Sequence, residues 1–294
     1  MIRLGDLVAT ARQALDAAGI AEAGLDAVWL VELATGCGRL VQMTDADRPV
    51  TVAEATRLQA NLARRLAGEP VGRIAGVRSF YGRSFSLGPA TLEPRADTEC
   101  LIDLVLRLVA DGGLPGVAAD GAGLDFVDIG TGSGAIAVTL LAELPAARGL
   151  ATDVAAAALA VARANADQLG VGDRLRLAAG SYLEPVPGRW PLIVANPPYI
   201  ATGVIASLAP EVRLFDPMLA LDGGADGLVA YRALAAGALA HLVPGGVLVV
   251  EIGFDQGAVV ASLLAAAGLT EIAVTADLAG CDRLVSGRAP GQNP

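Results

Sequence analysis

The fold of this chain is indicated most clearly by Leu124-Asp-Phe-Val-Asp-Ile-Gly-Thr-Gly-Ser-Gly-Ala-Ile-Ala-Val-Thr-Leu-Leu-Ala-Glu143. The apolar beginning of this stretch predicts a short buried strand over 125–129, and its end predicts a helix over 135–143. Between them, the glycines of Gly130-Thr-Gly-Ser-Gly134 allow backbone conformations that other residues avoid and let the backbone approach a ligand closely. A strand, a glycine turn and a helix in this order are typical of an α/β sheet that binds a ligand at its first turn.

An acidic residue lies at the tip of the next expected strand. This residue, Asp153, follows Gly132 by 21 residues, and a carboxylate there can accept hydrogen bonds from both hydroxyls of a ribose. Gly130, Gly132 and Ala135 also satisfy the GxGxx(G/A) pattern of dinucleotide sites, and Asp153 by itself could be a helix N-cap. Asp128 followed by the GxGxG turn favours the compact, cationic S-adenosylmethionine over a dinucleotide.

Asn196-Pro-Pro-Tyr199 closes a second apolar run, Pro191-Leu-Ile-Val-Ala195. Pro197 holds Asn196 in an extended conformation, and neither proline has an N–H group that would compete with the carbonyls of this loop. The Asn196 side-chain carbonyl and the Pro197 carbonyl can accept hydrogen bonds from a planar NH2 group, and Tyr199 offers a flat face. Alone, the motif could also be a turn that ends a buried strand. Together with the glycine turn it predicts that an electrophile is brought to an NH2 nitrogen.

Length and composition indicate an intracellular globular enzyme. The chain has 294 residues and 54% hydrophobic content, enough for one large domain, a small one and a sizeable core. Much of that content is alanine, and no run approaches the roughly 20 uninterrupted apolar residues of a membrane span. Residues 1–6 lack the basic region and apolar core of a secretory signal, so we expect a cytoplasmic protein. Three scattered cysteines and one histidine predict no disulfide framework, no metal site and no His-based triad.

The charge balance bears on possible partners. The formal net charge is −10, and all 21 basic residues are arginine. This acidic total argues against a broad duplex-binding surface, which normally has a basic face. The densest positive charge, at Arg64-Arg65 and over 73–83, is expected to be solvated surface. We therefore expect neither a direct nucleic-acid partner nor a membrane partner.

The chain divides into a helical part and an alternating part. Residues 4–67 have only helical periodicity, and Thr51 with Glu54 resembles a capping box at the start of one helix. A β-hairpin is expected over 76–87, and the tail Gly291-Gln-Asn-Pro294 is expected to be disordered. Strands alternating with helices predict a mostly parallel sheet, covered on both faces and carrying its ligand residues at the carboxyl ends of the strands. The strands are predicted near 125–129, 148–152, 175–178, 192–196, 247–252 and 271–275.

Several segments carry a resemblance to a known family. They are Gly68-Glu-Pro-Val71, Pro94-Arg-Ala-Asp-Thr-Glu99, Asp128-Ile-Gly-Thr-Gly-Ser-Gly134, Asn196-Pro-Pro-Tyr199, Ala220-Leu-Asp-Gly-Gly224 with Asp226-Gly227, Pro244-Gly-Gly246 and Glu251-Ile-Gly253. Over nearly its whole length the chain resembles the release factor glutamine methyltransferases of the HemK/PrmC type. The resemblance implies a small N-terminal helical bundle at 1–70 for substrate recognition, a β-hairpin linker at 71–95 and a Rossmann-like α/β class I methyltransferase domain with seven strands at 96–290.

The resemblance also implies an activity and a set of site residues. The implied reaction is methyl transfer from S-adenosylmethionine to the side-chain amide nitrogen of the glutamine in the GGQ motif of peptide chain release factors. The cofactor would be held by Gly130, Thr131, Gly132, Ser133, Gly134, Asp153, Tyr182 and Asn196. The substrate glutamine would be bound by Asn196, Pro197, Pro198 and Tyr199, of which Asn196, Pro197 and Tyr199 would be catalytic. The chain departs from the family pattern at Ser181, Met218 and Cys281.

Three other interpretations stay open at this point. The chain could methylate a glutamine of a ribosomal protein, or a base amine of DNA or RNA, since Asn-Pro-Pro-Tyr is shared with adenine- and guanine-amine methyltransferases. It could also be a non-catalytic binding module that keeps the cofactor fold as a scaffold. The acidic charge and the Pro94–Glu99 segment count against nucleic acid, and an intact Asn196–Tyr199 motif counts against the scaffold.

Overall fold

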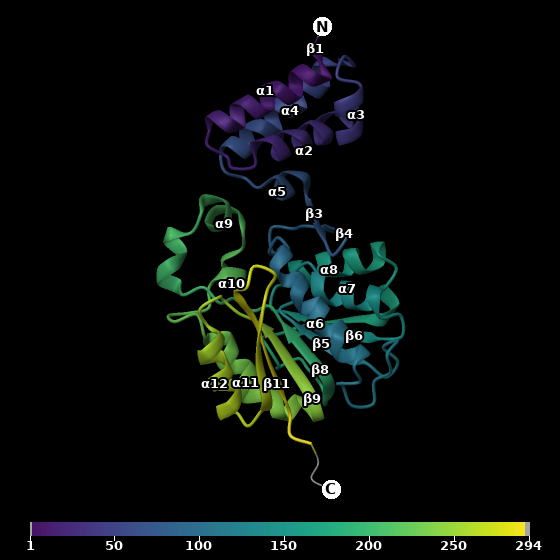
Figure 1. Ribbon diagram of the computed structural model, residues 1–294, viewed down its shortest axis with the longest axis vertical. Coiled ribbons are helices and arrows are strands. Elements are labelled where there is room, and N and C mark those ends of the chain that lie inside the picture. The colour runs from purple at the N-terminus through teal and green to yellow at the C-terminus, as the bar shows by residue number, and fades with distance from the viewer. Residues whose placement is uncertain (1, 292–294) are drawn as a thin grey trace. The chain divides into compact units, whose positions relative to one another are not determined.

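The computed structural model describes residues 2–291, which fall into two compact units (Figure 1). The helical unit comprises the chain up to Gly76 together with Ala209–Phe215, and the sheet unit comprises Val77–Leu208 and the chain from Asp216 onward. The helical unit therefore runs to Gly76 rather than to residue 70, and it takes in a segment from the second half of the chain. Of the tail expected to be disordered, all but Gly291 lies outside the described residues.

The helical unit is a bundle around its own apolar core. Leu4, Leu7, Ala11 and Leu15 are spaced by three or four residues, so they bury one face of the first helix. The elements of the unit are β1 (Ile2–Arg3), α1 (Leu4–Ala17), α2 (Ala23–Thr35), α3 (Arg39–Thr44), β2 (Pro49–Val50), α4 (Val52–Leu66), α5 (Val71–Ala75) and α9 (Pro210–Phe215).

Two polar interactions define the ends of α4. At its start, the Glu54 amide donates to Thr51 Oγ1 at 3.2 Å while the Thr51 amide donates to the Glu54 carboxylate at 2.7 Å, which confirms the predicted capping box. At its end, the buried Arg65 guanidinium pairs with Asp26 and with Glu211, each at 2.7 Å. Because a buried charge is costly without partners, the second pair explains why the segment containing α9 belongs to this unit.

The sheet unit holds a seven-stranded sheet, which confirms the predicted Rossmann-like α/β fold (Figure 1). The strand order is β10-β11-β9-β8-β5-β6-β7, with the five strands from β9 to β7 parallel and β11 antiparallel to both of its neighbours. The strands are β5 (Asp125–Ile129), β6 (Arg148–Asp153), β7 (Leu175–Ala179), β8 (Trp190–Ala195), β9 (Leu242–Glu251), β10 (Thr270–Ala276) and β11 (Asp282–Arg288).

Helices connect these strands and cover both faces of the sheet. They are α6 (Glu99–Ala110), α7 (Ala135–Glu143), α8 (Ala156–Gln168), α10 (Met218–Leu221), α11 (Val229–His241) and α12 (Gly257–Ala266), with short 3-10 helices at Ala96–Thr98, Gly172–Arg174 and Thr202–Ser207. A separate hairpin of β3 (Val77–Phe80) and β4 (Arg83–Ser86) precedes them. The hairpin confirms the prediction for 76–87.

Two strand predictions need correction. The strand expected from 247 begins at Leu242, because the run through Pro244-Gly-Gly246 continues the strand instead of forming a separate turn. The last strand, β11, was not predicted. Only Leu284, Val285 and Gly287 of its seven residues are buried, so the apolar pattern that would predict a strand is short. Hydrogen-bonded pairing with β9 and β10 holds this segment as a strand.

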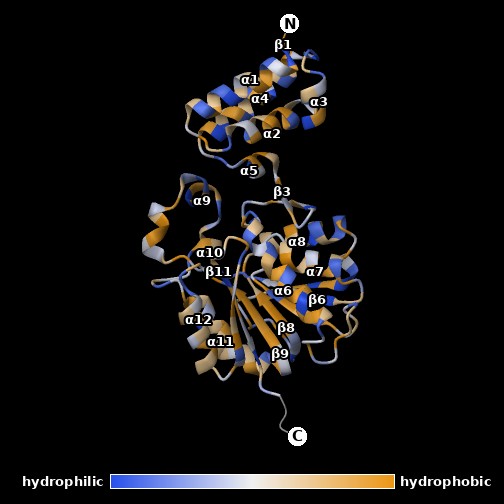
Figure 2. Ribbon diagram, in the orientation of Figure 1, coloured by the Kyte–Doolittle hydropathy of each residue, from blue (hydrophilic) through white to orange (hydrophobic). Residues whose placement is uncertain are grey.

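The sheet separates two apolar clusters. Neighbouring side chains along a strand point to opposite faces: Phe126 and Leu192 join the cluster under α6 and α7, whereas Val127 and Ile193 join the cluster under α11 and α12. Figure 2 shows the corresponding apolar character of β8 and β9 between these helices. Near-continuous apolar strands are what a parallel sheet buried on both faces requires.

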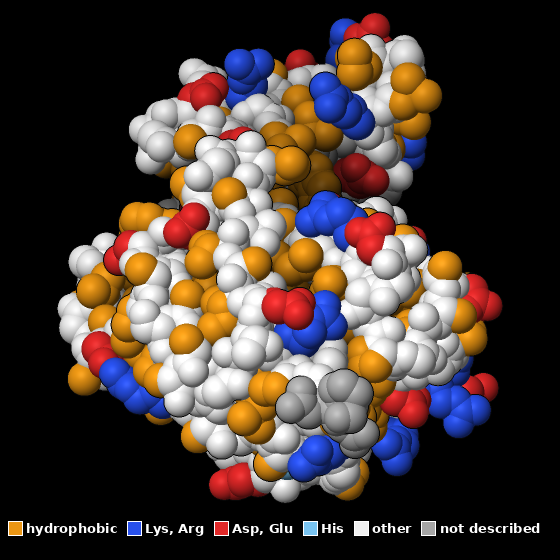
Figure 3. All heavy atoms as spheres, turned by 60° about the horizontal axis from the view of Figure 1, so that its bottom comes forward, with side chains coloured by type: hydrophobic (Ala, Val, Ile, Leu, Met, Phe, Trp, Pro, Cys, Tyr) orange, Lys and Arg blue, Asp and Glu red, His pale blue; other side chains and the backbone are white. Residues whose placement is uncertain are grey.

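The surface is mixed in character. On the face shown in Figure 3, arginine side chains are interspersed with acidic ones and are not gathered into one continuous patch. Within residues 2–291, no helix is long and apolar enough to cross a membrane. The same residues contain no group of three or more His, Cys, Asp or Glu side chains placed to hold a metal ion.

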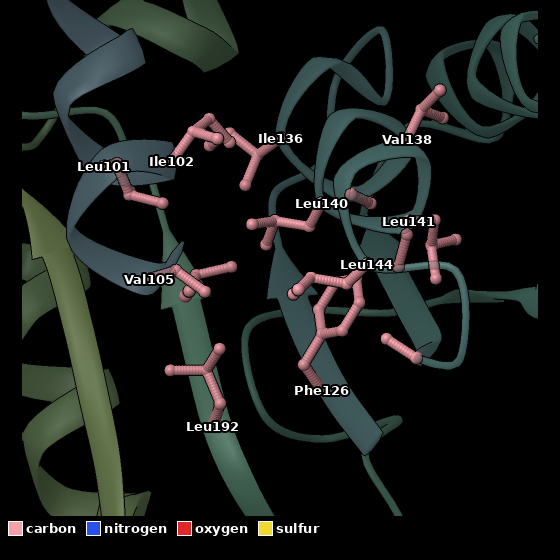
Figure 4. Packing of buried hydrophobic residues seen from close by; sticks show 14 of the residues in the cluster. Leu101, Ile102, Val105, Phe126, Ile136, Val138, Leu140, Leu141, Leu144 and Leu192 are labelled. Carbon is pink, nitrogen blue, oxygen red and sulfur yellow. The ribbon is translucent and has the colours of Figure 1, made fainter. Parts of the chain in front are cut away.

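The cluster under α6 and α7 supports the glycine turn that joins β5 to α7. In Figure 4, side chains from both helices and from two strands converge on one apolar centre. The labelled members are Leu101, Ile102 and Val105 of α6, Ile136, Val138, Leu140 and Leu141 of α7, Leu144 just after it, Phe126 of β5 and Leu192 of β8. Dense packing of this kind fixes where α7 begins, and hence where the turn lies.

One buried amide ties the hairpin to the same turn. Asn165 of α8 is fully buried, and its Oδ1 accepts a hydrogen bond from the Ser86 amide at 2.8 Å. Its Nδ2 donates to the carbonyls of Ser86 at 3.1 Å and Ser133 at 2.8 Å. A single side chain therefore links β4, α8 and the glycine turn.

Replacing Asn165 by alanine should lower the free energy of unfolding of the sheet unit by about 2–3 kcal/mol, because Ser86 and Ser133 would keep buried polar groups without partners. Urea unfolding followed by Trp190 fluorescence in a Trp29→Phe background measures this unit separately. Gln168→Ala, on the exposed side of the same helix, is the matched control and should change stability by less than about 0.5 kcal/mol. Equal unfolding curves for the two variants would contradict the linking role.

Candidate functional site

A cavity of about 390 Å³ lies beyond the carboxyl ends of β5, β6, β7 and β8. The strand order reverses between β5 and β8, and open α/β sheets bind ligands at such a point. The cavity is large enough for a nucleoside-sized ligand. Nine of the residues that the sequence indicated line it: Gly130, Thr131, Gly132, Ser133, Asp153, Tyr182, Asn196, Pro197 and Pro198.

The glycine turn presents bare backbone to this cavity. Gly130 and Gly132 have φ values of 71° and 56°, in the left-handed region, and a Cβ at either position would meet no atom within 4 Å. The Gly130 and Thr131 amides both donate to the carbonyl of Thr152 at 2.9 Å, which fastens the turn to β6. The open backbone can therefore approach a ligand without a side chain in the way.

Gly134 differs from the other glycines of the turn. A Cβ there would lie 3.1 Å from the Ala162 Cβ and 3.2 Å from its Cα, and the residue is outside the cavity lining formed by the described residues. The sequence placed Gly134 among the cofactor residues. In the structure it allows α7 to pack closely on α8.

Asp128 shapes the turn from behind. Its side chain is fully buried, and its Oδ2 accepts a hydrogen bond from Thr131 Oγ1 at 2.6 Å. Burial raises the pKa of Asp128 to about 7, although the bond from Thr131 acts in the opposite direction. In the sequence, Asp128 was one reason to expect S-adenosylmethionine. In the structure, Asp128 stabilises the conformation of the glycine turn and is not part of the cavity lining.

Asp153 connects the turn to the start of α8. Its Oδ2 accepts a hydrogen bond from the Gly132 amide at 2.9 Å, and its Oδ1 accepts one from the Ala155 amide at 2.8 Å. The N-cap of α8 is Ala155, so Asp153 does not cap that helix. A carboxylate has about four acceptor positions, so Asp153 keeps acceptor capacity for hydroxyls of a ligand in the cavity.

Tyr182 lies on the same side of the cavity and has an unusual backbone. It follows Gly180 and Ser181, both of which line the cavity, and its φ of 45° is rare for a residue with a side chain. Such conformations cluster at binding sites, where the surrounding structure holds them. Burial raises the pKa of Tyr182, so its hydroxyl stays protonated.

Asn196 leaves the end of β8 and reaches across to the segment before α6. Its Nδ2 donates a hydrogen bond to Thr98 Oγ1 at 3.1 Å. Pro197 is buried and Pro198 half-buried, and both line the cavity. Tyr199 lies outside the lining formed by the described residues; burial raises its pKa to about 12, and its carbonyl accepts from Gln256 Nε2 at 3.0 Å.

The loop after β8 rests on a glycine-rich segment to which the sequence assigned no role. A Cβ on Gly223 would lie 2.8 Å from the Pro198 carbonyl oxygen, and one on Gly227 would lie 2.4 Å from that of Tyr199. The Gly223 amide also donates to the Ile200 carbonyl at 2.8 Å. Because only glycine permits so close a backbone approach, this glycine-rich segment determines the position of the loop after β8.

Residues outside the predicted set complete the site. Arg95 and Thr98, from the segment Pro94–Glu99, both line the cavity, and Arg95 pairs with Asp216 at 2.6 Å. The resemblance had marked this segment without giving its residues a role. Of the three departures from the family pattern, Ser181 lines the cavity, whereas Met218 and Cys281 are exposed.

Comparison with known proteins identifies the family. A family profile described as PrmC N-terminal domain matches residues 6–76, and one described as Methyltransferase small domain matches residues 117–212. A release factor glutamine methyltransferase from Cereibacter sphaeroides is 49% identical over 98% of this chain and 99% of that relative. The chain belongs to the release factor glutamine methyltransferase family. Relatives of the same name from Bradyrhizobium diazoefficiens and Agrobacterium fabrum are 45% and 42% identical over 97% and 95% of this chain, and over 95% and 94% of the relatives.

Solved structures share the fold of this family member at low identity. The catalytic domain of hMettl16, solved in complex with the MAT2A 3′UTR hairpin 6, superposes with a TM-score of 0.56 at 16% identity and covers 82% of each chain. A methyltransferase from Pyrococcus furiosus gives a TM-score of 0.50 at 17% identity and covers 79% of this chain and 98% of that one. The protein is a methyltransferase, and its cofactor is S-adenosylmethionine.

The cavity of this methyltransferase suits its cofactor. The open backbone of Gly130 and Gly132 could receive the methionine part, the Asp153 carboxylate could accept from the ribose hydroxyls, and Tyr182 could offer a flat surface to the adenine. We infer these contacts from the chemistry of the lining.

Removing the Asp153 carboxylate should weaken S-adenosylmethionine binding by about 10- to 100-fold, the usual range for a lost charged acceptor. Isothermal titration calorimetry on folded Asp153→Ala measures this affinity, with circular dichroism as the check of folding. Asp173→Ala removes an exposed acid in the same unit and is the charge-matched control. Cofactor affinity equal to that of the control would show that Asp153 does not bind the ribose.

Adding a methyl group at Gly223 should displace the loop after β8 and reduce turnover by about 10- to 100-fold, since small misplacements of reacting groups have effects of this size. Gly203→Ala is a suitable control, because a Cβ at Gly203 meets nothing within 4 Å. Steady-state methyl transfer is compared for the two variants at matched folded fractions. Wild-type turnover in Gly223→Ala would mean that the close approach to Pro198 is not required.

Proposed function

We propose that the protein transfers a methyl group from S-adenosylmethionine to the side-chain amide nitrogen of the glutamine in the GGQ motif of peptide chain release factors. The observation that carries the proposal is that the glycine turn with Asp153 and Asn196 with Pro197 line one and the same cavity. Relatives named release factor glutamine methyltransferase, at 42–49% identity, further support a release factor glutamine as the acceptor.

The chemistry asked of the site is the activation of a poor nucleophile. The lone pair of an amide nitrogen is delocalised into its carbonyl group. Asn196 Oδ1 and the Pro197 carbonyl oxygen can each accept one N–H of the glutamine, which orients the NH2 group and raises electron density on nitrogen. The same two oxygens stabilise the positive charge that develops on nitrogen, as preorganised dipoles do at other active sites.

S-adenosylmethionine, held by the glycine turn and Asp153, would supply an electrophilic methyl group to the nitrogen that Asn196 and Pro197 orient. The nitrogen then loses one proton to water, because the methylated, positively charged amide is strongly acidic. No strong base is therefore required of the protein. His241, the one histidine of the sequence, lies at the end of α11, where its Nδ1 is 3.0 Å from the Gly237 carbonyl oxygen.

A protein acceptor is consistent with the charge of the molecule. A net charge of −10 without lysine gives a nucleic acid few of the cation contacts that normally supply affinity, and arginines are dispersed on the face in Figure 3. The helical unit exposes apolar side chains that can contact a protein: Trp29, Leu33, Leu40 and Met43 are 37%, 38%, 74% and 72% exposed. We propose that this unit contributes to the docking of the release factor.

Incubation of the protein with labelled S-adenosylmethionine and an intact release factor should label the GGQ glutamine, as located by mass mapping of peptides. A release factor with that glutamine replaced by alanine is the matched control and should stay unlabelled. Asn196→Ala should lose about 10²- to 10³-fold in turnover, the scale for one preorganised polar contact, while it retains most of its cofactor affinity.

Two outcomes would contradict the proposal. Wild-type turnover in folded Asn196→Ala would make the Asn-Pro-Pro-Tyr motif a structural turn. Label in ribosomal protein, DNA or RNA, with none in the release factor, would assign the activity to another acceptor.

A further inference from the structure

A buried carboxylate lies behind Asn196. Glu251 is the last residue of β9, next to β8 in the sheet, and it is 2% exposed. Ala195 of β8 and Val250 of β9 are paired in register, so Asn196 and Glu251 follow at the same level of neighbouring strands, and Asn196 Nδ2 donates to Thr98 Oγ1 at 3.1 Å. Three side chains from three distant segments thus form one polar group within the apolar sheet unit.

This arrangement selects one orientation of the Asn196 amide. An ionised carboxylate can only accept hydrogen bonds, a threonine hydroxyl both donates and accepts, and a primary amide donates at nitrogen and accepts at oxygen. Since Nδ2 donates to Thr98 Oγ1, Asn196 Oδ1 lies on the other side of the amide. A flipped amide would lose the bond from Nδ2 to Thr98 and would turn Oδ1 toward the side of the Glu251 carboxylate, where two acceptors repel.

We propose that Glu251 and Thr98 are positioning residues that hold the Asn196 amide with its Oδ1 directed to the nitrogen of the acceptor. The proposal rests on the role proposed for Asn196 above and adds the groups that make that role possible. Neither residue needs to touch the acceptor for this purpose. Each acts through the orientation of Asn196.

The charge of Glu251 adds to this effect. A negative charge beside Nδ2 polarises the amide and raises the electron density on Oδ1, which then stabilises developing positive charge more strongly. Burial raises the pKa of Glu251 to about 7, while the hydrogen bonds from Thr98 and Asn196 and the charge of Arg283 oppose the rise. Turnover should therefore increase as the pH passes upward through the range in which Glu251 loses its proton.

Other titratable and charged groups surround Glu251. Arg283 of β11 is held by Asp277 at 3.0 Å and lies 3.6 Å from Asp97, and its positive charge favours the ionised form of Glu251, whereas Asp97 disfavours it. Three further neighbours of Glu251 are Cys100, Tyr199 and Tyr231. Burial raises the pKa values of Cys100 and Tyr199 to about 12 and also raises the pKa of Tyr231, so all three stay protonated around pH 7.

The first test removes the hydroxyl of Thr98 without changing its volume. Thr98→Val should lower kcat by about 10- to 100-fold, as a lost preorganised contact does, and should leave the affinity for S-adenosylmethionine within about twofold of wild type. Thr98→Ser keeps the hydroxyl and should restore most of the turnover. Thr139→Val is the control for a buried threonine, because the Thr139 hydroxyl has no hydrogen-bond partner in the described structure, and it should be as active as wild type.

The second test asks whether the effect passes through Asn196. In an Asn196→Ala background, Thr98→Val and Glu251→Gln should cause little additional loss, because residues that act as a unit are not additive. Losses that multiply in the double variants would show that Thr98 and Glu251 act independently of Asn196, and would overturn the proposal.

The third test does not depend on activity. In the intact protein, the Nδ2 hydrogens of Asn196, assigned by their absence in Asn196→Ala, should shift in 15N–1H NMR spectra with a midpoint near pH 7 as Glu251 ionises. Both this shift and the rise of kcat over the same pH range should vanish in Glu251→Gln. Persistence of the NMR shift in Glu251→Gln, or wild-type kcat in folded Thr98→Val, would overturn the proposal.

The outcomes separate this inference from the proposed function. Inactive Asn196→Ala together with fully active Thr98→Val and Glu251→Gln would reject only the positioning role. Active Asn196→Ala would reject the chemistry proposed for the site as a whole.

Discussion

The parallel register of β5 with its two neighbours is the constraint on which the site depends. Ile129 at the end of β5 is level with Thr152 in β6 and with Ala195 in β8. The next residues along the three strands are Gly130, Asp153 and Asn196, so all three lie at the same edge and the same level of the sheet. A shift of register by one residue would also turn every side chain to the opposite face of the sheet. The two apolar clusters that cover those faces therefore preserve the geometry of the cavity.

Buried polar groups then set the loops on this edge. Asp128 holds Thr131 in the glycine turn, Asn165 ties that turn to the hairpin, and Glu251 lies beside Asn196. Each of these groups is buried, where an unsatisfied hydrogen bond is costly. That cost makes alternative loop conformations unfavourable, so a small number of polar contacts can determine the shape of the cavity.

Burial raises the pKa values of two carboxyl groups to about 7, and these two groups lie behind different parts of the cavity. Asp128 lies behind the part of the cavity suited to the cofactor, and Glu251 lies behind the part suited to the acceptor amide. Both have folded-state pKa values of about 7, above those of an unfolded chain. Between roughly pH 4 and pH 7 the folded protein therefore binds more protons than the unfolded chain, and the contribution of these groups to stability falls as the pH rises through that interval. Ionising these two groups in the folded protein therefore lowers its free energy of unfolding, and other interactions of the fold compensate for this loss.

The sequence by itself determined those features of the protein that depend only on residues close together in the chain. The glycine turn, the acid that ends β6, the Asn-Pro-Pro-Tyr motif, the hairpin and the capping box at Thr51 could all be predicted, because turn conformation, strand alternation and helix capping are set within a few residues. Composition and motif order were also sufficient for the α/β class. By contrast, β11 was missed, because its buried residues are few and its place is set by β9 and β10.

Only the tertiary structure decided which distant residues meet. Thr98 lies 98 residues before Asn196, and Gly223 approaches Pro198 from a loop beyond the motif. The tertiary structure also places Gly134 at the contact between α7 and α8, where the sequence had indicated a cofactor residue. It places Tyr199 outside the cavity lining formed by the described residues. These relations follow from the order and register of the strands, which bring together segments whose separation in the sequence carries no local signal. The physical reason is that a buried hydrogen bond or a close backbone approach depends on three-dimensional distance, whereas the pattern of one segment reports only on its own conformation.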